Sequence, residues 1–185
     1  MFHMEQKDYK FEIINELIGK KEHARELAKK LKTNHTTILR KLKELSKDNV
    51  LDFNEEGRNK VYFLKKTSEA KTHIFISEQY KLTKILKEYP SLRSIFEKIQ
   101  KNRKIKLAIL FGSYAKNLAK KESDIDIYIE TANIKLKNDL EKVNSKLNVK
   151  IGKYNKENLL IKEIEKNHVI IKGVEIFYEK CKIFD

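Results

Sequence analysis

Two short stretches in the second half of the chain carry residues whose types and spacing suit chemistry on phosphates. Gly112 follows an apolar run, and a glycine lets the backbone approach a phosphate closely. Ser113 adds a hydroxyl at the start of an expected helix, whose free N–H groups favour anions. Asp124 and Asp126 lie two residues apart on an expected strand, so both carboxylates project from one face. Such a pair can hold a divalent cation beside a triphosphate.

Alternating strands and helices are expected to position these residues. The apolar run 105–111 has the pattern of a buried strand, and 124–130 alternates as a half-buried strand does, with its isoleucines toward the core. The remaining segments are expected as a helix at 114–120, a helix at 136–147, a strand at 149–154, a helix at 155–166 and a strand at 174–178. The sequence therefore predicts a C-terminal α/β domain with a small mixed sheet.

The runs Leu110–Lys116 and Glu122–Ile129 resemble the motif of the DNA polymerase β-type nucleotidyltransferase superfamily, in which a Gly-Ser turn precedes Asp-x-Asp on the next strand. The minimal nucleotidyltransferases of archaea and bacteria are the branch that these runs resemble most, over roughly residues 92–180. The resemblance implies that Asp124 and Asp126 hold Mg²⁺ and are the catalytic residues of nucleoside monophosphate transfer to a hydroxyl. It also implies contacts to a nucleoside triphosphate from Gly112, Ser113, Lys116 and Ser123.

This sequence departs from the superfamily pattern at one place. Active members carry a third carboxylate on a later strand, here expected within 147–154, where Asn148 and Lys150 share the face of the Asp pair and no acid occurs. Lys150 is the residue that we expect at the missing position. Glu130 is a poor substitute, because four residues along a strand separate it from Asp126 by about 13 Å. Nucleotide and metal binding are therefore expected, whereas turnover is left open.

The first third of the chain has the pattern of three helices and a hairpin. Apolar residues recur at helical spacing in the segments 9–19, 22–31 and 35–47. Asn34 is expected to cap the third helix through the backbone N–H of Thr36 or Thr37. Two β-prone runs, 50–53 and 60–64, flank a polar, glycine-containing turn. The order and lengths of these elements resemble a winged helix-turn-helix domain over residues 9–66, so the fold class expected for the whole chain is α+β.

A winged helix-turn-helix domain presents the N-terminal part of its third helix to base edges in the major groove. The residues expected to contact double-stranded DNA are His35, Thr36, Thr37, Arg40 and Lys41 on that helix, and Arg58 and Lys60 on the wing. The alternative is a helical module used only for protein contact or dimerisation.

Composition narrows the class of partner. The 185 residues include 41 Lys and Arg and 27 Asp and Glu, which gives a formal net charge of +14. This excess of positive charge favours a polyanion as binding partner, with nucleic acid as the first candidate. The single cysteine, Cys181, excludes an intramolecular disulfide framework. Apolar runs stay far shorter than the roughly 18 residues of a membrane span, so the expected location is the cytoplasm.

The expected domains are a winged helix-turn-helix at 1–67, a helical connector at 68–91 and a nucleotidyltransferase-like domain at 92–185. The connector carries an apolar stripe that suits either core packing or a homodimer contact. The sequence leaves two interpretations of His168 open, a metal ligand or base and a structural histidine. The main hypothesis is DNA binding fused to nucleoside triphosphate and Mg²⁺ binding. The alternative is a transcriptional regulator or antitoxin-like protein with an inactive transferase domain and a toxin–antitoxin type of protein partner.

Overall fold

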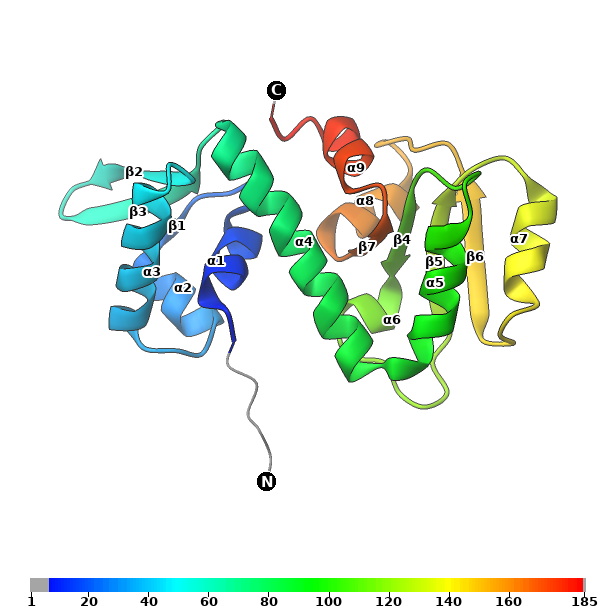
Figure 1. Ribbon diagram of the computed structural model, residues 1–185. Coiled ribbons are helices and arrows are strands. Elements are labelled where there is room, and N and C mark those ends of the chain that lie inside the picture. Colours follow the sequence, from blue (N-terminus) through cyan, green and yellow to red (C-terminus); the bar gives the residue numbers. More distant parts are fainter. Residues whose placement is uncertain (1–6, 185) are drawn as a thin grey trace. The chain divides into compact units, whose positions relative to one another are not determined.

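The computed structural model describes residues 7–184 and divides them into two compact units (Figure 1). The N-terminal unit contains the residues up to Ser77 together with Ile183 and Phe184, and the C-terminal unit is Glu78–Lys182. Each unit mixes helices with a small sheet, so the predicted α+β class is confirmed. None of the helices in residues 7–184 is long and apolar enough to cross a membrane.

Within the described residues, the N-terminal unit has three complete helices, the first part of α4 (Ser68–Glu88) and a three-stranded antiparallel sheet of order β1-β3-β2. Its elements are α1 (Tyr9–Leu17), β1 (Glu22–His23), α2 (Ala24–Lys30), α3 (His35–Lys47), β2 (Leu51–Glu56) and β3 (Asn59–Leu64). This is the topology of a winged helix-turn-helix domain, with the β2–β3 hairpin as the wing. The second helix was expected to begin at Glu22, which is wrong. Glu22 and His23 instead pair with Tyr62 and Val61 of β3, and the helix begins only after them.

Local capping and apolar spacing explain the third helix. The side chain of Asn34 accepts a hydrogen bond from the backbone N–H of Thr37 at 2.7 Å, so its predicted role as N-cap is confirmed. Ile38, Leu42 and Leu45 recur at helical spacing and are buried. Their burial turns the opposite, polar face of α3 toward solvent.

The C-terminal unit contains a mixed sheet, as the sequence predicts, with four strands in the order β6-β5-β4-β7. The sequence did not predict the last of these strands at residues 169–172. The strands are β4 (Ala108–Phe111), β5 (Ile125–Glu130), β6 (Leu147–Gly152) and β7 (Val169–Lys172). The helices are α5 (Arg93–Lys101), α6 (Gly112–Ala115), α7 (Ile134–Glu141), α8 (Leu159–Lys166) and α9 (Val174–Cys181), with a short 3-10 turn, η1, at Pro90–Leu92. The division between the units falls within α4 (Ser68–Glu88).

One face of this sheet packs against helices and forms the main core of the unit. Ile125, Ile127 and Ile129 of β5 join α5, α7 and the end of α4 there, which confirms the predicted core face of the strand (Figure 1). Because side chains alternate along a strand, Asp126 lies on the opposite face. Asp126 is thus held by a strand whose other side is buried.

Several expected elements of this unit need correction. Residues 174–178 were expected to be a strand but begin α9, because Val174, Phe177 and Tyr178 have helical spacing and are all buried. The helix expected at 155–166 begins only at Leu159, since Asn158 is the residue that caps it. The other two helices are shorter than expected, ending at Ala115 and spanning Ile134–Glu141.

Candidate functional site

The junction of β4 and α6 brings Gly112 against Asp126. Phe111, the last residue of β4, is opposite Asp126 in the antiparallel register of β4 and β5. Gly112 has a φ of +71°, and a Cβ atom at this position would lie 2.6 Å from Oδ2 of Asp126. A side chain is therefore disfavoured for two reasons, the left-handed backbone and the close carboxylate. The two halves of the predicted motif thus meet in space at this glycine.

Asp126 is half-buried and incompletely neutralised. Its Oδ1 accepts a hydrogen bond from Nδ2 of Asn148 at 2.8 Å. Burial raises the pKa of Asp126, and the negative charges of Asp124 and Glu163 raise it further, against the lowering effects of Asn148 and Lys150. A carboxylate in this condition gains stability when a cation binds beside it.

Asp124 lies just before β5, which begins at Ile125 rather than at the expected residue 124. The backbone N–H of Ile125 donates to the carbonyl oxygen of Lys146 at 2.8 Å, and this bond holds the entry to the strand. Asp124 is exposed and acts on the pKa of Asp126. Across residues 7–184, no three His, Cys, Asp or Glu side chains gather into a metal-binding group. Mg²⁺ is often bound by one or two carboxylates plus substrate phosphates, so the pair fits one nucleotide-bound Mg²⁺.

The side chain directly beside Asp126 on the neighbouring strand is Asn148. Parallel pairing of β5 and β6 places Asn148 opposite Asp126 and Lys150 opposite Tyr128. The expectation that Lys150 occupies the place next to the Asp pair is therefore wrong. The strand register spans 22 residues of sequence, and no local signal in the chain specifies it. The direct neighbour of Asp126 is a neutral amide, and the charge of Lys150 acts on Asp126 from one pair further along the strand.

The other predicted nucleotide contacts lie on the connection between β4 and β5. Ser113 is in α6, and Lys116 is the C-cap residue of that helix. Nζ of Lys116 forms an ion pair with Oε1 of Glu163 on α8 at 3.0 Å. Ser123 accepts a hydrogen bond from the backbone N–H of Lys120 at 2.9 Å, so its hydroxyl shapes the loop before Asp124. Sequence reasoning missed Glu163, because a lone glutamate on a charged helix carries no distinctive signal.

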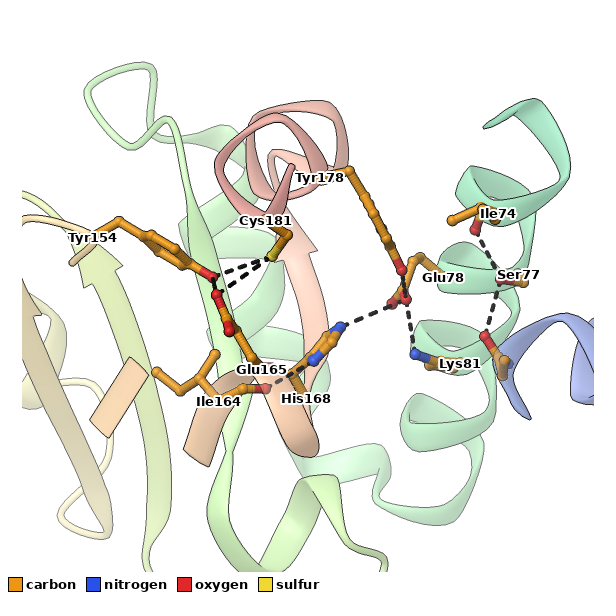
Figure 2. Close-up of polar contacts among 11 residues, drawn as sticks. Ile74, Ser77, Glu78, Lys81, Tyr154, Ile164, Glu165, His168, Tyr178 and Cys181 are labelled. Carbon is orange, nitrogen blue, oxygen red and sulfur yellow. Dashed lines mark hydrogen bonds and ion pairs between the residues drawn. The ribbon is translucent and has the colours of Figure 1, made fainter. Parts of the chain in front are cut away.

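His168 has a structural environment (Figure 2). Its Nδ1 lies 2.8 Å from the carbonyl oxygen of Ile164, and its ring packs against Phe177 with centroids 4.5 Å apart. Nε2 points toward Glu78 of α4, 3.6 Å from Oε1. Tyr178 donates a 2.6 Å hydrogen bond to the same oxygen of Glu78. These contacts favour the structural interpretation of His168 over a role as metal ligand or base.

Cys181 is also engaged in a packed cluster (Figure 2). Its Sγ lies 3.2 Å from the hydroxyl of Tyr154, which donates to Glu165 at 2.7 Å. Burial raises the pKa of the Cys181 thiol to about 11. The thiolate that a nucleophile requires is therefore disfavoured at neutral pH.

A second candidate site is the polar face of the N-terminal unit. His35, Thr36 and Arg40 of α3 are exposed, as are Arg58 and Lys60 of the wing. Two other residues predicted to contact DNA are less exposed or already paired. Thr37 is half-buried, and Nζ of Lys41 forms an ion pair with Glu44 at 2.9 Å.

A hollow of about 340 Å³ lies between the start of α3 and the wing. It is lined by His23, Ala24, Arg25, Glu26, His35, Leu39, Arg58, Asn59, Lys60 and Tyr62. The structure thus gathers three predicted residues, His35, Arg58 and Lys60, but leaves the predicted residues at 36, 37, 40 and 41 outside the lining. Sequence reasoning missed His23 and Arg25, which β1 and the start of α2 bring to the same hollow. Five basic or imidazole side chains against one acid make this surface suited to an anion.

Comparison with known proteins supports the assignment of the C-terminal unit. The family model described as polymerase beta, nucleotidyltransferase, matches residues 93–176, which include the Gly-Ser turn and both aspartates. The chain therefore carries a nucleotidyltransferase-type domain, and the predicted superfamily is confirmed for these residues. No curated protein matches the chain.

Solved structures similar to the chain include two bacterial proteins. Reduced HlyU from Vibrio cholerae N16961 has 19% identity and a TM-score of 0.36, over 40% of this chain and 77% of that one. Adhesin competence repressor AdcR from Streptococcus pyogenes has 17% identity and a TM-score of 0.40, over 50% of this chain and 69% of that one. Similarity this low implies nothing about function, and the winged-helix assignment rests on the topology of the N-terminal unit.

Proposed function

We propose that the protein binds a nucleoside triphosphate with Mg²⁺ in its C-terminal unit and double-stranded DNA with its N-terminal unit. The observation that carries the nucleotide proposal is the junction of Gly112 with Asp126. There, a backbone free of side chain adjoins a carboxylate whose pKa is raised and whose side-chain hydrogen-bond partner is a neutral amide. The two activities share one chain, so the protein is a DNA-binding protein with a nucleotide-binding domain.

Each residue of the nucleotide site has a distinct part in this proposal. Asp124 and Asp126 hold the metal ion, which neutralises phosphate charge when it is bound. Gly112 leaves room for the phosphates at the end of β4, and Lys116 attracts them by its charge. Asn148 orients Asp126 through their 2.8 Å hydrogen bond. An amide cannot accept a proton from an attacking hydroxyl, so the site supports binding more strongly than turnover.

Nucleotide binding is tested with the full chain by calorimetry with a nucleoside triphosphate, in Mg²⁺ and in EDTA. We expect binding that depends on Mg²⁺ and is lost in both Asp124→Ala and Asp126→Ala. Asp139→Ala is the matched control, because Asp139 is an exposed aspartate of α7 in the same unit. Absence of Mg²⁺-dependent binding in the unmodified protein would refute the proposal.

Transfer of a nucleoside monophosphate is the second candidate function, and the family match over residues 93–176 favours it. Incubation with an α-³²P-labelled nucleoside triphosphate tests it, with label counted on the protein itself and on added RNA or hydroxyl-bearing small molecules. We expect any transferred label to disappear in Asp126→Ala. Tight nucleotide binding without label transfer would identify the domain as a binding module.

The DNA proposal rests on the basic hollow between α3 and the wing. Phosphate contacts from Arg and Lys make DNA affinity fall with salt, because each contact releases bound counterions. We expect binding of random-sequence duplex to weaken as salt rises, and the log–log slope to drop by about one in Arg58→Ala. Arg40→Ala tests the exposed face of α3, and Arg93→Ala, an exposed arginine of α5, is the control. Duplex binding that is absent at low salt would overturn this part of the proposal.

A further inference from the structure

We propose that a second hollow of the N-terminal unit binds a small carboxylate with an aliphatic body. The hollow lies between the turn that follows α1, the end of β3 and the first part of α4, and its volume is about 220 Å³. All of its lining residues belong to the N-terminal unit. It shares no residue with the nucleotide site or with the basic hollow beside the wing, so the proposal is independent of both proposed functions.

The wall of this hollow is apolar. Its side chains come from α1, β3, α4 and the last described residue of the chain, and include Leu17, Phe63, Ile74 and Phe184. Leu17 and Ile74 are only 1% exposed, whereas Phe63 and Phe184 are half-buried. An aliphatic chain placed against this wall would remove apolar surface from water, which favours binding.

Lysines are the charged side chains at this wall, and they come from two separate parts of the chain. Two precede β1 and two follow β3: Lys20, Lys21, Lys65 and Lys66. Antiparallel pairing of these strands places Glu22 opposite Tyr62. The residues just before Glu22 therefore run beside those just after Tyr62, and the two lysine pairs meet at one hollow.

The charge at the hollow is positive. No aspartate or glutamate is among the described residues that line it. Nζ of Lys65 donates a 2.5 Å hydrogen bond to Oδ1 of Asn49, a neutral amide, so this bond leaves the charge of the lysine in place. Lys20 forms an ion pair with Glu16 at 3.3 Å, outside the lining. An anion is therefore the kind of ligand that this lining favours.

The contact between Lys21 and Phe63 joins the charged part of the hollow to the apolar part. Nζ of Lys21 lies 5.1 Å from the centroid of the Phe63 ring. A carboxylate paired with this ammonium group would thus have an apolar surface beside its carbon chain. The volume is below the roughly 300–1,000 Å³ of sites for drug-sized ligands, so a small molecule fits it. An inorganic anion would leave the wall in water, and an uncharged molecule would leave the lysines without a partner.

The test compares three probes on the full chain by calorimetry: octanoate, acetate and 1-octanol. We expect acetate to bind at least about tenfold more weakly than octanoate, because it lacks the carbon chain that would cover the wall. We expect 1-octanol to bind about threefold to fivefold more weakly, which is the scale of one exposed ion pair. Octanoate that binds no more tightly than acetate, or no more tightly than 1-octanol, would overturn the proposal.

Two variants and a control locate the site. Lys21→Gln and Lys65→Gln should each weaken octanoate binding by about threefold, because each removes one exposed charge. Lys29→Gln should not, since Lys29 is an exposed lysine of α2 outside the hollow. Amide chemical shifts in nuclear magnetic resonance spectra should move on octanoate addition at Lys21, Phe63 and Ile74. Equal affinities in the three variants, or shifts confined to other residues, would refute this site while leaving nucleotide and DNA binding untouched.

Discussion

Two carboxylates of the C-terminal unit, Glu78 and Asp126, are held in opposite electrostatic states. Glu78 is fully buried, and burial alone favours its neutral form, but Lys81 and His168 outweigh this effect and lower its pKa to about 2. Asp126 is less buried, yet its pKa is raised, because burial outweighs the hydrogen bond from Asn148. The deeper carboxylate is thus the better stabilised one.

The difference lies in the partners that the fold provides. Nζ of Lys81 lies 2.8 Å from Glu78, and the hydroxyl of Tyr178 donates to the same carboxylate at 2.6 Å (Figure 2). Asp126 has a neutral amide as its hydrogen-bond partner. The cation beside Glu78 favours a structural role for that carboxylate, whereas the raised pKa of Asp126 is consistent with the proposed binding site.

The largest expected effect is on stability at Glu78. Glu78→Gln should lower the free energy of unfolding by about 3 kcal/mol, because it leaves the partly buried Lys81 without its counter-charge. Chemical denaturation at neutral pH measures this change, with Glu88→Gln, an exposed position on the same helix, as the control. Asp126→Asn should be neutral or stabilising without Mg²⁺. Equal losses of unfolding free energy in Glu78→Gln and Asp126→Asn would contradict the difference between the two carboxylates.

The two carboxylates should also differ in their response to acid. The folded-state pKa of Glu78, about 2, lies below its ordinary value of 4.5, so the stability from its ionised form is present above pH 4.5. That contribution fades as pH falls from 4.5 toward 2. The stability gap between the unmodified protein and Glu78→Gln should therefore close over this range, as measured by denaturation at several pH values. The pKa of Asp126 is raised, so protonation in acid removes a destabilising charge from the folded state. Asp126→Asn should therefore be at least as stable as the unmodified protein at neutral pH, and any difference in stability should shrink in acid.

A smaller effect is expected at the glycine next to Asp126. Gly112→Ala should destabilise the protein by about 2 kcal/mol through its left-handed backbone, and contact with Asp126 adds to this. Gly57→Ala is the matched control, because Gly57 also has a positive φ, of +60°, but would meet no atom within 4 Å. Thermal unfolding of both variants separates the contact from the backbone strain. Equal losses would show that the approach of Asp126 has no energetic consequence.

The smallest expected effect is on stability at Asn148, the hydrogen-bond partner of Asp126. Asn148→Asp replaces the amide donor with a second carboxylate, and should destabilise the protein without metal by about 1 kcal/mol, through the lost hydrogen bond and like-charge repulsion. Mg²⁺ should reverse the loss, since two adjacent carboxylates favour a divalent cation. Melting temperatures in EDTA and in Mg²⁺ measure both effects. An Asn148→Asp protein that Mg²⁺ does not stabilise would argue against a metal site on this face of β5.

Features that depend on a few adjacent residues could be predicted from the amino-acid sequence. The Gly-Ser turn and the Asp-x-Asp pair identified the nucleotidyltransferase-type domain, the alternation of 125–129 indicated which face of β5 is buried, and Asn34 marked the start of α3. Caps and periodic burial act within one or two turns of chain, so their residue types are sufficient evidence.

Contacts between residues far apart in the sequence could not be predicted in this way, because they depend on how whole elements pack. The register of β5 and β6 put Asn148 rather than Lys150 beside Asp126, and the packing of α8 brought Glu163 to Lys116. Val174 begins a helix, although the β-prone residues that it leads favoured a strand. Strand register and helix packing are set by the burial of whole elements, and a short segment does not carry that information. The motif can therefore be recognised in the sequence, whereas the polar and charged side chains that surround it are brought there by the fold.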